Sequence, residues 1–374
     1  MILTIFCGDC RKPYLRHETL MTVNQRAANG AAKPGYDMNK RVSLKDIAAA
    51  VGVSAALVSY VLNNKKEGRI SKVVAEKIRA TAAAMNYRTN QIARSLKTNK
   101  TNTIGLILAD IANPFSAALA RVIEDAADKY NYTVIFGSSD ENPEKYRKIL
   151  DALINRQADG LILSPPEHAE SQIKELQQQQ IPFVLIDRYF PGIETNYVAL
   201  DNYKAALQAT QHLVDSGYTR IGMINYASAL FHLQERSRGY QAALAENRIS
   251  VKKNYLQLVY AGNIKEETEA AVENFLSGPA PAEALLFGSN IIAMHAVKYI
   301  NHKKIKVPED IALLCFDETD AFDLFYAPLT CIRQPVKEMG ELAVELLLKN
   351  VKDSNIKIKQ LTLDGELIVR ASTI

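Results

Sequence analysis

The chain has 374 residues, of which 48% are hydrophobic and 23% are charged, and its formal net charge is +4. This length is enough for two or three globular domains. Its four scattered cysteines are too few for a disulfide framework, which favours a reducing compartment. No apolar run reaches the roughly 18 residues of a membrane span, so no membrane partner is expected.

The net charge hides an uneven distribution along the chain. Residues 38–100 hold 13 Lys and Arg residues against three acidic residues, a balance of +10, whereas residues 101–374 sum to −8. A small basic segment next to a larger acidic one suggests a part that binds a polyanion and a separate body. A solvated basic surface would have the same charge, so the motifs must distinguish the two.

Residues 1–37 contain no secretory signal, because their few apolar residues precede their charges. Cys7 and Cys10 have the spacing of half a zinc site, with His17 nearby, but a structural site needs four ligands and no second pair is close. We therefore expect no metal. The segment AANGAAKPGYD is rich in turn residues. Residues 1–37 are interpreted as a mis-called start or as a disordered extension.

The stretch LKDIAAAVGVSAALVSYVLN, residues 44–63, predicts two short helices that meet at a glycine. Ser43 is placed to cap the first helix, with Asp46 in the capping-box position. Gly52 permits the positive φ that a tight turn needs. Ser54 is placed to cap the second helix.

The two faces of the second predicted helix differ in character. Val58, Val61 and Leu62 have the helical spacing of a buried face. The opposite face carries small or polar residues, namely Ala55, Ala56, Ser59 and Tyr60. Such a smooth face, without the charge pairs of an ordinary exposed helix, suits insertion into the major groove of DNA. The pair of helices therefore predicts a helix-turn-helix.

A third helix is predicted to begin after Ser71, a candidate N-cap, with Val74, Ile78 and Met85 closing a small core. These three apolar residues recur at helical spacing. The basic head would then be a three-helix unit.

A short helical pattern follows in residues 90–96. Two turns are far below the roughly 12–15 residues that an isolated helix needs in water. Leu96 is presented between Arg94 and Lys97, which fits a wedge that opens a base step in the minor groove. A plain linker is the alternative, and only the flanking motifs favour the wedge.

From residue 103 the pattern changes to short β-rich runs that alternate with amphipathic helical stretches, such as residues 115–130 and 205–218. Strands are predicted at residues 103–108, 133–138, 160–164, 182–187, 220–225, 284–288 and 311–317. Near-continuous apolar strands with crossover helices predict parallel sheets in an α/β fold. About 270 residues are enough for two such sheets.

Polar and aromatic side chains follow several of these strands, where parallel sheets bind ligands. The candidates are Asp110, Asn113, Phe115, Asp187, Arg188, Arg236, Arg238, Asn290 and Asp317. Planar carboxylate, amide and guanidinium groups beside an aromatic ring are suited to hold a hydroxyl-rich ligand. Each residue alone is explained more simply as a cap or turn residue, but their common placement favours a cleft.

Residues 41–101 resemble the DNA-binding head of the lactose-repressor (LacI/GalR) family of bacterial transcription regulators. The stretch SLKDIAAAVGVSAALVSYVLN matches the helix-turn-helix of that family, and ARSLKT matches its hinge helix. Because the family head begins a few residues before VSLKDIA, the resemblance points to Met38 as the true start.

The rest of the chain resembles the type I periplasmic-binding-protein fold that forms the effector core of the same family. Matching segments are IGLILADIANPF, VLIDR, ERSRGYQAAL, VPEDIALLCFDE and PLTCIRQPVKEMGELAVELLL. The resemblance implies an α-helical helix-turn-helix domain (38–88), a hinge helix or linker (89–101) and an α/β core of two parallel-sheet subdomains (102–374). The chain would cross between subdomains near 202, near 334 and again before the C-terminus.

The resemblance also implies a role for individual residues of the head. Ala55, Ala56 and Tyr60 match positions that contact base edges, and Leu96 matches the minor-groove leucine. Phosphate or nearby groove contacts are implied for Ser54, Ser59, Asn63 and Lys97, and Arg94 is also expected to bind DNA. The two alanines replace larger polar residues of the family and offer only apolar contacts, so Tyr60, Leu96 and DNA deformability are expected to contribute more of the specificity.

In the core, the resemblance aligns Arg236, Asn290 and Asp317 with effector-binding positions and Phe115 with a ring-stacking position. Asp110, Asn113 and Asp187 complete the expected effector site. The family usually has an aspartate directly after the asparagine that corresponds to Asn290, and here that residue is Ile291. A sugar or sugar derivative is the expected effector.

The resulting prediction is a ligand-responsive repressor that binds a palindromic operator on double-stranded DNA as a homodimer in the bacterial cytoplasm, associated with the nucleoid. The sequence leaves open whether the effector releases DNA or promotes its binding. No catalytic motif is present and no cofactor is expected. A solute-binding protein with the same core fold is the alternative, but that function leaves the basic head unexplained.

Overall fold

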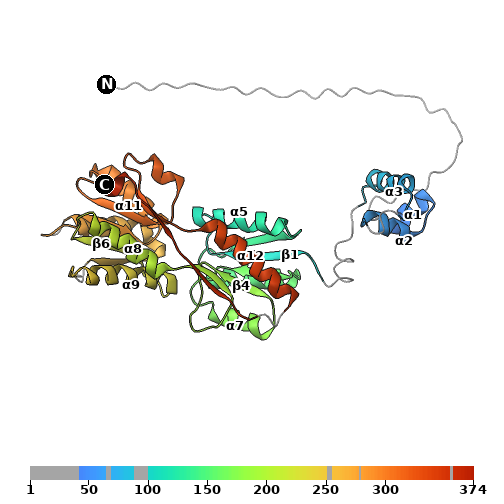
Figure 1. Ribbon diagram of the computed structural model, residues 1–374, viewed down its shortest axis with the longest axis horizontal. Helices are drawn as coiled ribbons and strands as arrows, with labels where there is room; N and C mark the ends of the chain where they lie inside the picture. The colour runs from blue at the N-terminus through green and yellow to red at the C-terminus, as the bar shows by residue number, and fades with distance from the viewer. Residues whose placement is uncertain (1–41, 65–68, 88–99, 251–254, 278, 354–356) are drawn as a thin grey trace, which may run out of the picture. The chain divides into compact units, whose positions relative to one another are not determined.

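The computed structural model describes residues 42–64, 69–87, 100–250, 255–277, 279–353 and 357–374. It divides into two compact units, Met1–Thr89 and Asn90–Ile374, which we call the head and the core (Figure 1). The predictions for residues 1–37, for most of the hinge segment 89–101, and for Arg94, Leu96 and Lys97 lie outside the described residues.

The head contains three helices, α1 (Leu44–Val51), α2 (Ala55–Leu62) and α3 (Lys72–Ala84). The capping box is confirmed, because Asp46 accepts a hydrogen bond from the Ser43 backbone N–H at 2.8 Å while the Ser43 hydroxyl accepts one from the Asp46 N–H. Gly52 ends α1 at a φ of 78°, and the Ser54 hydroxyl accepts a hydrogen bond from the Leu57 N–H at 3.2 Å.

Ser71 is the N-cap residue of α3, as predicted. Helix α3 begins after Ser71, but the Ser71 side chain makes no capping hydrogen bond. Ser71, Lys72 and Val73 are all exposed, so water can satisfy the N–H groups of the first turn. Ser71 therefore marked the start of α3 in the sequence, although its side chain donates and accepts no capping hydrogen bond there.

A small apolar core holds the three helices together. Ile47 from α1, Val58 from α2 and Ile78 from α3 are fully buried, and partly buried Val74 and Met85 pack against them. Within the described residues no single helix has the length and apolar character needed to cross a membrane, and only α1 and α2 combined, with a bend of 106° between them, meet that test.

The core is built on two six-stranded sheets. The first sheet has the order β11–β5–β4–β3–β1–β2, and every pair in it is parallel. Its strands are β1 (Thr103–Leu108), β2 (Thr133–Ser138), β3 (Gly160–Leu163), β4 (Phe183–Ile186), β5 (Tyr197–Leu200) and β11 (Gln360–Leu363).

The second sheet repeats this arrangement in the order β12–β10–β9–β8–β6–β7. Its strands are β6 (Ile221–Tyr226), β7 (Leu256–Val259), β8 (Ala284–Phe287), β9 (Ala312–Phe316), β10 (Thr330–Arg333) and β12 (Glu366–Ile368). Only the pairing of β10 with β12 is antiparallel. The predicted fold class, a helical head with a core of two parallel-sheet subdomains, is confirmed.

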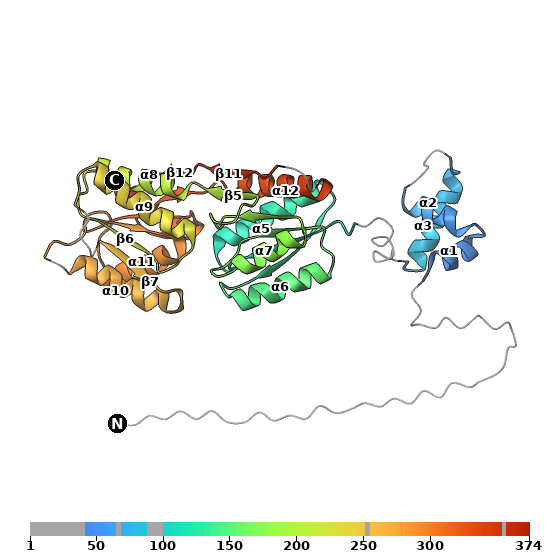
Figure 2. The same ribbon diagram turned by 90° about the horizontal axis from the view of Figure 1, so that it is seen from below.

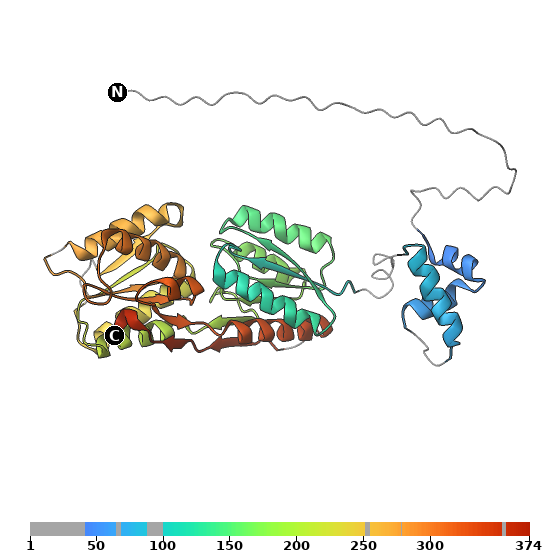
Figure 3. The same cartoon turned by 90° about the horizontal axis from the view of Figure 1, so that it is seen from above.

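Helices cover both faces of each sheet, and we call each sheet with its helices a lobe (Figures 2 and 3). The first lobe carries α5 (Pro114–Asp128), α6 (Pro143–Asn155), α7 (Glu170–Gln178) and α12 (Val336–Lys352). The second carries α8 (Asn202–Asp215), α9 (Phe231–Glu246), α10 (Ile264–Leu276) and α11 (Asn290–Lys303). Short 3₁₀ turns occupy Ala261–Asn263, Asp320–Leu324 and Ala371–Thr373.

The burial of β1 explains why its sequence is almost continuously apolar. Leu106 and Leu108 pack in the cluster under α5 and α12, whereas Ile107 between them packs under α6. Side chains alternate between the two faces of a strand, so a sheet covered on both faces needs apolar residues at every position.

The strand order places three chain crossings between the lobes. The chain leaves the first lobe between β5 and α8, returns between β10 and α12, and crosses again between β11 and β12. In Figure 2 β5, β11, β12 and α8 lie along one edge of the core, where the lobes are joined. The lobes are thus connected at one edge, and their strand ends face each other beside it.

Candidate functional site

The head presents one face of α2 to solvent. Ser54, Ala56, Tyr60 and Asn63 are exposed, while Ala55 and Ser59 are half-buried. Ala55 packs against the apolar core of the head, so only part of its side chain is available for contacts. The Asn63 side-chain amide donates a hydrogen bond to the Ser59 carbonyl oxygen at 2.8 Å, which closes the end of α2. The face available to DNA is therefore small and nearly free of charge.

Basic side chains precede and follow α2 in the sequence. The exposed cations among the described residues of the head are Lys45, Arg69, Lys72, Lys77 and Arg79. One of them, Arg79, donates a hydrogen bond to the Asn64 side-chain oxygen at 3.1 Å. In proteins that bind DNA, basic side chains commonly contact phosphates and position the element that reads the bases.

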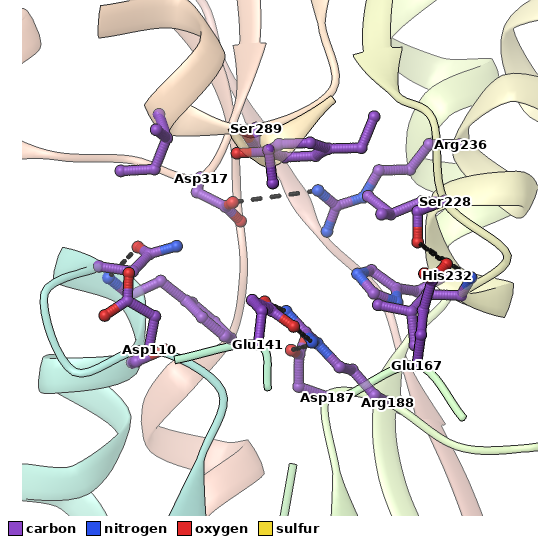
Figure 4. Close-up of a pocket in the computed structure, with 18 of the residues that line it drawn as sticks. Asp110, Glu141, Glu167, Asp187, Arg188, Ser228, His232, Arg236, Ser289 and Asp317 are labelled. Atoms are coloured by element: carbon purple, nitrogen blue, oxygen red, sulfur yellow. Dashed lines mark hydrogen bonds and ion pairs between the residues drawn. The ribbon is translucent and has the colours of Figure 1, made fainter. Parts of the chain in front are cut away.

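A cavity of about 440 Å³ lies between the two lobes of the core (Figure 4). Residues at or just after the carboxyl ends of nine strands line it, because parallel strands of both sheets end at this cleft. These residues are Asp110, Glu141, Glu167, Asp187, Tyr226, Ala261, Ser289, Asp317 and Gln334. The repeated topology of the lobes thus brings distant parts of the sequence into one site.

Asp187 and Asp317 occupy equivalent positions in the two lobes. Asp187 follows β4 and Asp317 follows β9, which stand third in the strand orders of their sheets. Both residues have a φ of 68°, in the left-handed region. The Asp187 N–H donates to the Val198 carbonyl oxygen at 2.9 Å, and the Asp317 N–H donates to the Ile332 carbonyl oxygen at 3.0 Å. This strained backbone holds both carboxylates at the cleft, where Figure 4 shows them approaching from opposite lobes.

Arg236 on α9 is almost fully buried at 3% exposure. Its Nε donates to the Asn202 Oδ1 at 2.8 Å, its Nη1 donates to the Gly288 carbonyl oxygen at 2.6 Å, and Nη1 lies 3.9 Å from the Asp317 Oδ2. The guanidinium also lies 4.1 Å from the centre of the Phe316 ring. Arg236 therefore links α9 to the first chain crossing and to the end of β9.

Arg188 holds the acidic groups of the first lobe together. Its two terminal nitrogens donate to the two carboxylate oxygens of Glu141 at 2.7 and 2.6 Å, and its Nε lies 3.4 Å from Asp187. Burial alone would lower the pKa of Arg188, but Glu141 and Asp187 raise it above its ordinary value. For Asp187, burial dominates and raises the pKa of the carboxyl group.

Two hydrogen-bonded groups connect the lobes across the cleft. The Asn290 Nδ2 of the second lobe donates to the Asn113 Oδ1 of the first lobe at 2.9 Å. The Ser228 hydroxyl donates to Glu167 Oε1 at 2.6 Å, and the Ala229 N–H donates to the same oxygen. The lobes thus enclose the cavity in a closed arrangement.

The structure places most of the predicted effector residues at this cavity. Asp110, Asn113, Phe115, Asp187, Arg188, Arg236 and Asp317 line it. Asn290 is fully buried between the lining residues Ser289 and Ile291. Arg238, in contrast, is exposed and lies over the Tyr203 ring, because two residues along a helix rotate a side chain to the opposite face.

Several lining residues were not predicted from the sequence. Glu141, Glu167 and Tyr226 lie at strand ends, so the same positional signal could have found them. Gln334 directly follows β10, a strand that was not predicted, and His232 on α9 carries no such signal. Within the described ranges, no group of three or more His, Cys, Asp or Glu residues is arranged to hold a metal ion.

A helix-turn-helix head followed by a two-lobed core with a cavity between its lobes defines the class of transcriptional regulators that carry a periplasmic-binding-protein-like domain. Residues 43–90 match the model of bacterial regulatory proteins of the lacI family. Residues 210–373 match the model of the periplasmic binding protein-like domain. The relatives below are DNA-binding transcriptional regulators, not enzymes.

The HTH-type transcriptional regulator KdgR of Bacillus subtilis (strain 168) is 30% identical over 334 residues, which cover 88% of this chain and 97% of the relative. The solved structure of the transcription regulator CcpA of Lactococcus lactis is 29% identical, with a TM-score of 0.67 over 73% of this chain and 99% of that one. The lac repressor dimer bound to operator and the anti-inducer ONPF, at 22% identity and a TM-score of 0.79 over 90% and 100% of the chains, shares the fold. The chain belongs to the LacI family.

Proposed function

We propose that this regulator is a repressor that binds a palindromic operator as a homodimer, with an affinity set by a small sugar-like effector in the cleft. The observation that carries the proposal is the closed cavity, lined from both lobes, on the same chain as a helix-turn-helix. A solute-binding protein would need the core alone, and that alternative gives the head no function.

The exposed face of α2 supports contact with the major groove. Ala55 and Ala56 offer only apolar surface, which suits a thymine methyl group, whereas Tyr60 combines a ring with a hydroxyl. Ser54, Ser59 and Asn63 are proposed to bind phosphates or nearby groove atoms. Arg94, Leu96 and Lys97, which lie outside the described residues, are proposed to act in the minor groove.

Exposed apolar side chains on two edge strands support a homodimer. Ile135 and Phe136 on β2 are 38% and 58% exposed, and Leu258 on β7 is 53% exposed. Both strands are the last in their sheet order, so each leaves a row of backbone groups unpaired on one side. A second copy covering these edges would bury the apolar surface and place two heads on inverted half-sites.

The cavity supports regulation by a ligand because its wall comes from two lobes. A ligand that contacts Asp187 of the first lobe and Arg236 and Asp317 of the second binds best when the lobes are closed. Such a ligand shifts the equilibrium between lobe arrangements by its difference in affinity for them. We propose that residues 89–101, which join the head to the core in sequence, transmit this shift to DNA binding.

The proposal is tested by selecting binding sites from a random double-stranded DNA pool with the full chain. We expect recovered sites with two inverted half-sites, a dimer in sedimentation equilibrium, and loss of specific affinity in Tyr60→Ala. The control is Tyr130→Ala, which removes an exposed tyrosine of the core. Failure to enrich any sequence at physiological salt would contradict the proposal.

A further inference from the structure

The cavity wall carries an excess of negative charge. Five carboxylates line it, from Asp110, Glu141, Glu167, Asp187 and Asp317, against only two guanidinium groups, from Arg188 and Arg236. With every carboxylate ionised, three negative charges are left without a cation in the wall. Burial raises the pKa of Asp187, but the wall keeps a net negative charge even when this carboxylate takes up a proton.

His232 does not offset this excess. Its side chain is buried in the cavity wall, and burial together with Arg188 and Arg236 holds the pKa of its imidazole well below the ordinary value. The imidazole is therefore neutral near pH 7. A cationic ligand would offset this excess of negative charge.

Arg188 and Arg236 already donate hydrogen bonds to protein groups, although Arg188 Nε is buried without a hydrogen-bond partner among the described residues. The terminal nitrogens of Arg188 donate to Glu141, and Arg236 donates to Asn202 and to the Gly288 carbonyl oxygen. A phosphate or carboxylate ligand that bound these nitrogens would have to displace their partners, and it would also add negative charge beside Asp317. Both effects disfavour an acidic ligand.

Two amide oxygens at the cavity are buried acceptors without a donor, alongside the unpaired Arg188 Nε and His232 Nδ1. Gln334 Nε2 donates to Asp317 Oδ1 at 2.6 Å, and Gln334 Oε1 is buried without a hydrogen-bond partner among the described residues. Rotating this amide would place its oxygen against the Asp317 carboxylate, so the orientation is set by charge. A buried acceptor without a donor costs free energy, which a ligand N–H or O–H removes.

Asn290 shows the same pattern beside the cavity. Its Nδ2 donates to Asn113 Oδ1, which also accepts a hydrogen bond from the Phe115 N–H at 3.0 Å. The oxygen of Asn113 is thus fixed as the acceptor, and the amide of Asn290 must present its nitrogen. Asn290 Oδ1 is left buried with no partner in the described part of the chain.

The wall also carries apolar side chains, which suit a ring better than an extended amine. Phe115, Leu230, Leu233, Ile264 and Ile291 line the same cavity. Apolar side chains beside polar groups bind the two kinds of surface that a sugar ring presents. A linear polyamine would leave the hydroxyl-binding groups at the strand ends without partners.

We propose that the effector is a hydroxyl-bearing ring with a protonated amine, the chemistry of an amino sugar, and that acidic sugars do not bind. This inference rests on the proposed function of the cleft and specifies its ligand. A cation that contacts both Asp187 of the first lobe and Asp317 of the second attracts both lobes. The same charge therefore provides selectivity and favours closure.

The test uses calorimetric titration of the full chain with matched sugars of gluco, galacto and manno stereochemistry. Each series contains the 2-amino sugar, its N-acetyl derivative, the neutral parent and the uronic acid. We expect the amine of at least one series to bind about tenfold tighter than its neutral parent and its N-acetyl derivative, and no acid to bind. Equal binding of a neutral parent, binding of an acid, or no binding by any amine would overturn the inference.

Two variants test the origin of the selectivity. Asp317→Asn should reduce the affinity for the amine about tenfold and that for the neutral parent much less. Asp110→Asn, at a half-exposed position, provides a second variant if Asp317→Asn fails to fold. Asp151→Asn on the exposed surface of α6 makes the same charge change away from the cavity and should leave affinity unchanged. An equal loss for amine and neutral parent would contradict the charge argument.

DNA affinity, measured in parallel by fluorescence anisotropy, separates two kinds of failure. If the chain binds its selected operator but no amine, the ligand inference alone fails. If the chain ignores DNA at physiological salt, the proposed function fails whatever the sugars do.

Discussion

Arg236 is a buried cation whose hydrogen bonds go mainly to neutral oxygens. It is held by Asn202 Oδ1 and the Gly288 carbonyl oxygen, with the Asp317 carboxylate at 3.9 Å. Buried charges of this kind are stable only while their partners stay in place, because an unpaired buried charge is costly. The residue thus couples the structure of the cleft to its binding chemistry.

We expect Arg236→Ala to lower the free energy of unfolding of the core by about 3 kcal/mol, because Asp317 loses its cation and the neighbouring oxygens lose a donor. Effector binding should be lost while DNA binding at low temperature is retained. Chemical denaturation and anisotropy check the two parts. Arg238→Ala, which removes an exposed guanidinium two residues away, is the control and should change both quantities little.

His232 should make the stability of the core depend on pH. Because burial, Arg188 and Arg236 lower the pKa of His232, the unfolded chain takes up a proton at this residue below about pH 6.5 while the folded chain does not. The contribution of His232 is therefore fully present above that pH and is lost as the pH falls.

We expect His232→Gln to flatten the decline in stability between pH 7 and pH 5. The wild-type contribution from this residue has a limiting slope of about 1.4 kcal/mol per pH unit. Denaturation midpoints of both proteins across this range, referred to their difference at pH 8, provide the measurement. Parallel curves for the two proteins would show that His232 does not titrate on unfolding.

At the scale of elements, α8 and α9 approach each other closely at Gly239. A Cβ atom at this position would lie 2.2 Å from the Tyr203 carbonyl oxygen and 2.9 Å from the Ala206 Cβ. Glycine is required here because two helices of the second lobe contact each other through backbone atoms. The same contact positions α9, which carries Arg236 and His232 into the cavity wall.

Gly239→Ala should therefore destabilise the second lobe by about 1–3 kcal/mol, since backbone atoms of α8 must move to make room. Thermal unfolding of the full chain measures the loss. The matched control is Gly262→Ala, where a Cβ atom would meet nothing within 4 Å. An unchanged unfolding temperature for Gly239→Ala would mean that the helices separate at no cost.

The predicted elements differ in how well local sequence located them. Strands β1 and β2 begin and end at the predicted residues 103–108 and 133–138. The strands that were not predicted are β5, β7, β10, β11 and β12, each of three or four residues. The predicted strands β3, β4 and β8 are equally short, but they are continuous buried apolar runs. By contrast, β7, β11 and β12 mix polar and partly exposed residues, so they lack this signal.

At the scale of the whole molecule, the charge is divided between a basic head and an acidic core. Binding of a cationic head to DNA releases counterions, so its affinity depends strongly on salt. A ligand enclosed in the cavity of the core is screened much less. Salt should therefore weaken DNA binding far more than the proposed binding of an effector.

We expect the operator affinity to fall by about 10³-fold or more between 50 and 200 mM salt if six or more phosphates are contacted. Replacing Lys45 and Lys77 of the head by Gln should make this dependence shallower. The control variant replaces the exposed Lys265 and Lys298 of the core, with the same change in charge. Anisotropy titrations at four salt concentrations check the slopes, and an equal effect of both variants would contradict a head-specific contact.

The sequence by itself determined the modules of this protein. The capping box, Gly52 and the Ser54 cap are local signals that act over a few residues, so they identified the two helices of the head. Buried strands with crossover helices identified the parallel sheets for the same reason. Seven of the nine predicted ligand residues line the cavity, and Asn290 lies beside it, because strand ends are recognisable in the sequence.

Only the tertiary structure decided what the cavity can bind. Glu141 faces Arg188, Glu167 faces Ser228, and Gln334 faces Asp317, and in each case the partners are separated by at least 17 residues in sequence. Which charges are compensated and which acceptors stay unfilled depends on how the two lobes close on each other. That closure results from packing between distant segments, and no local pattern of residues records it.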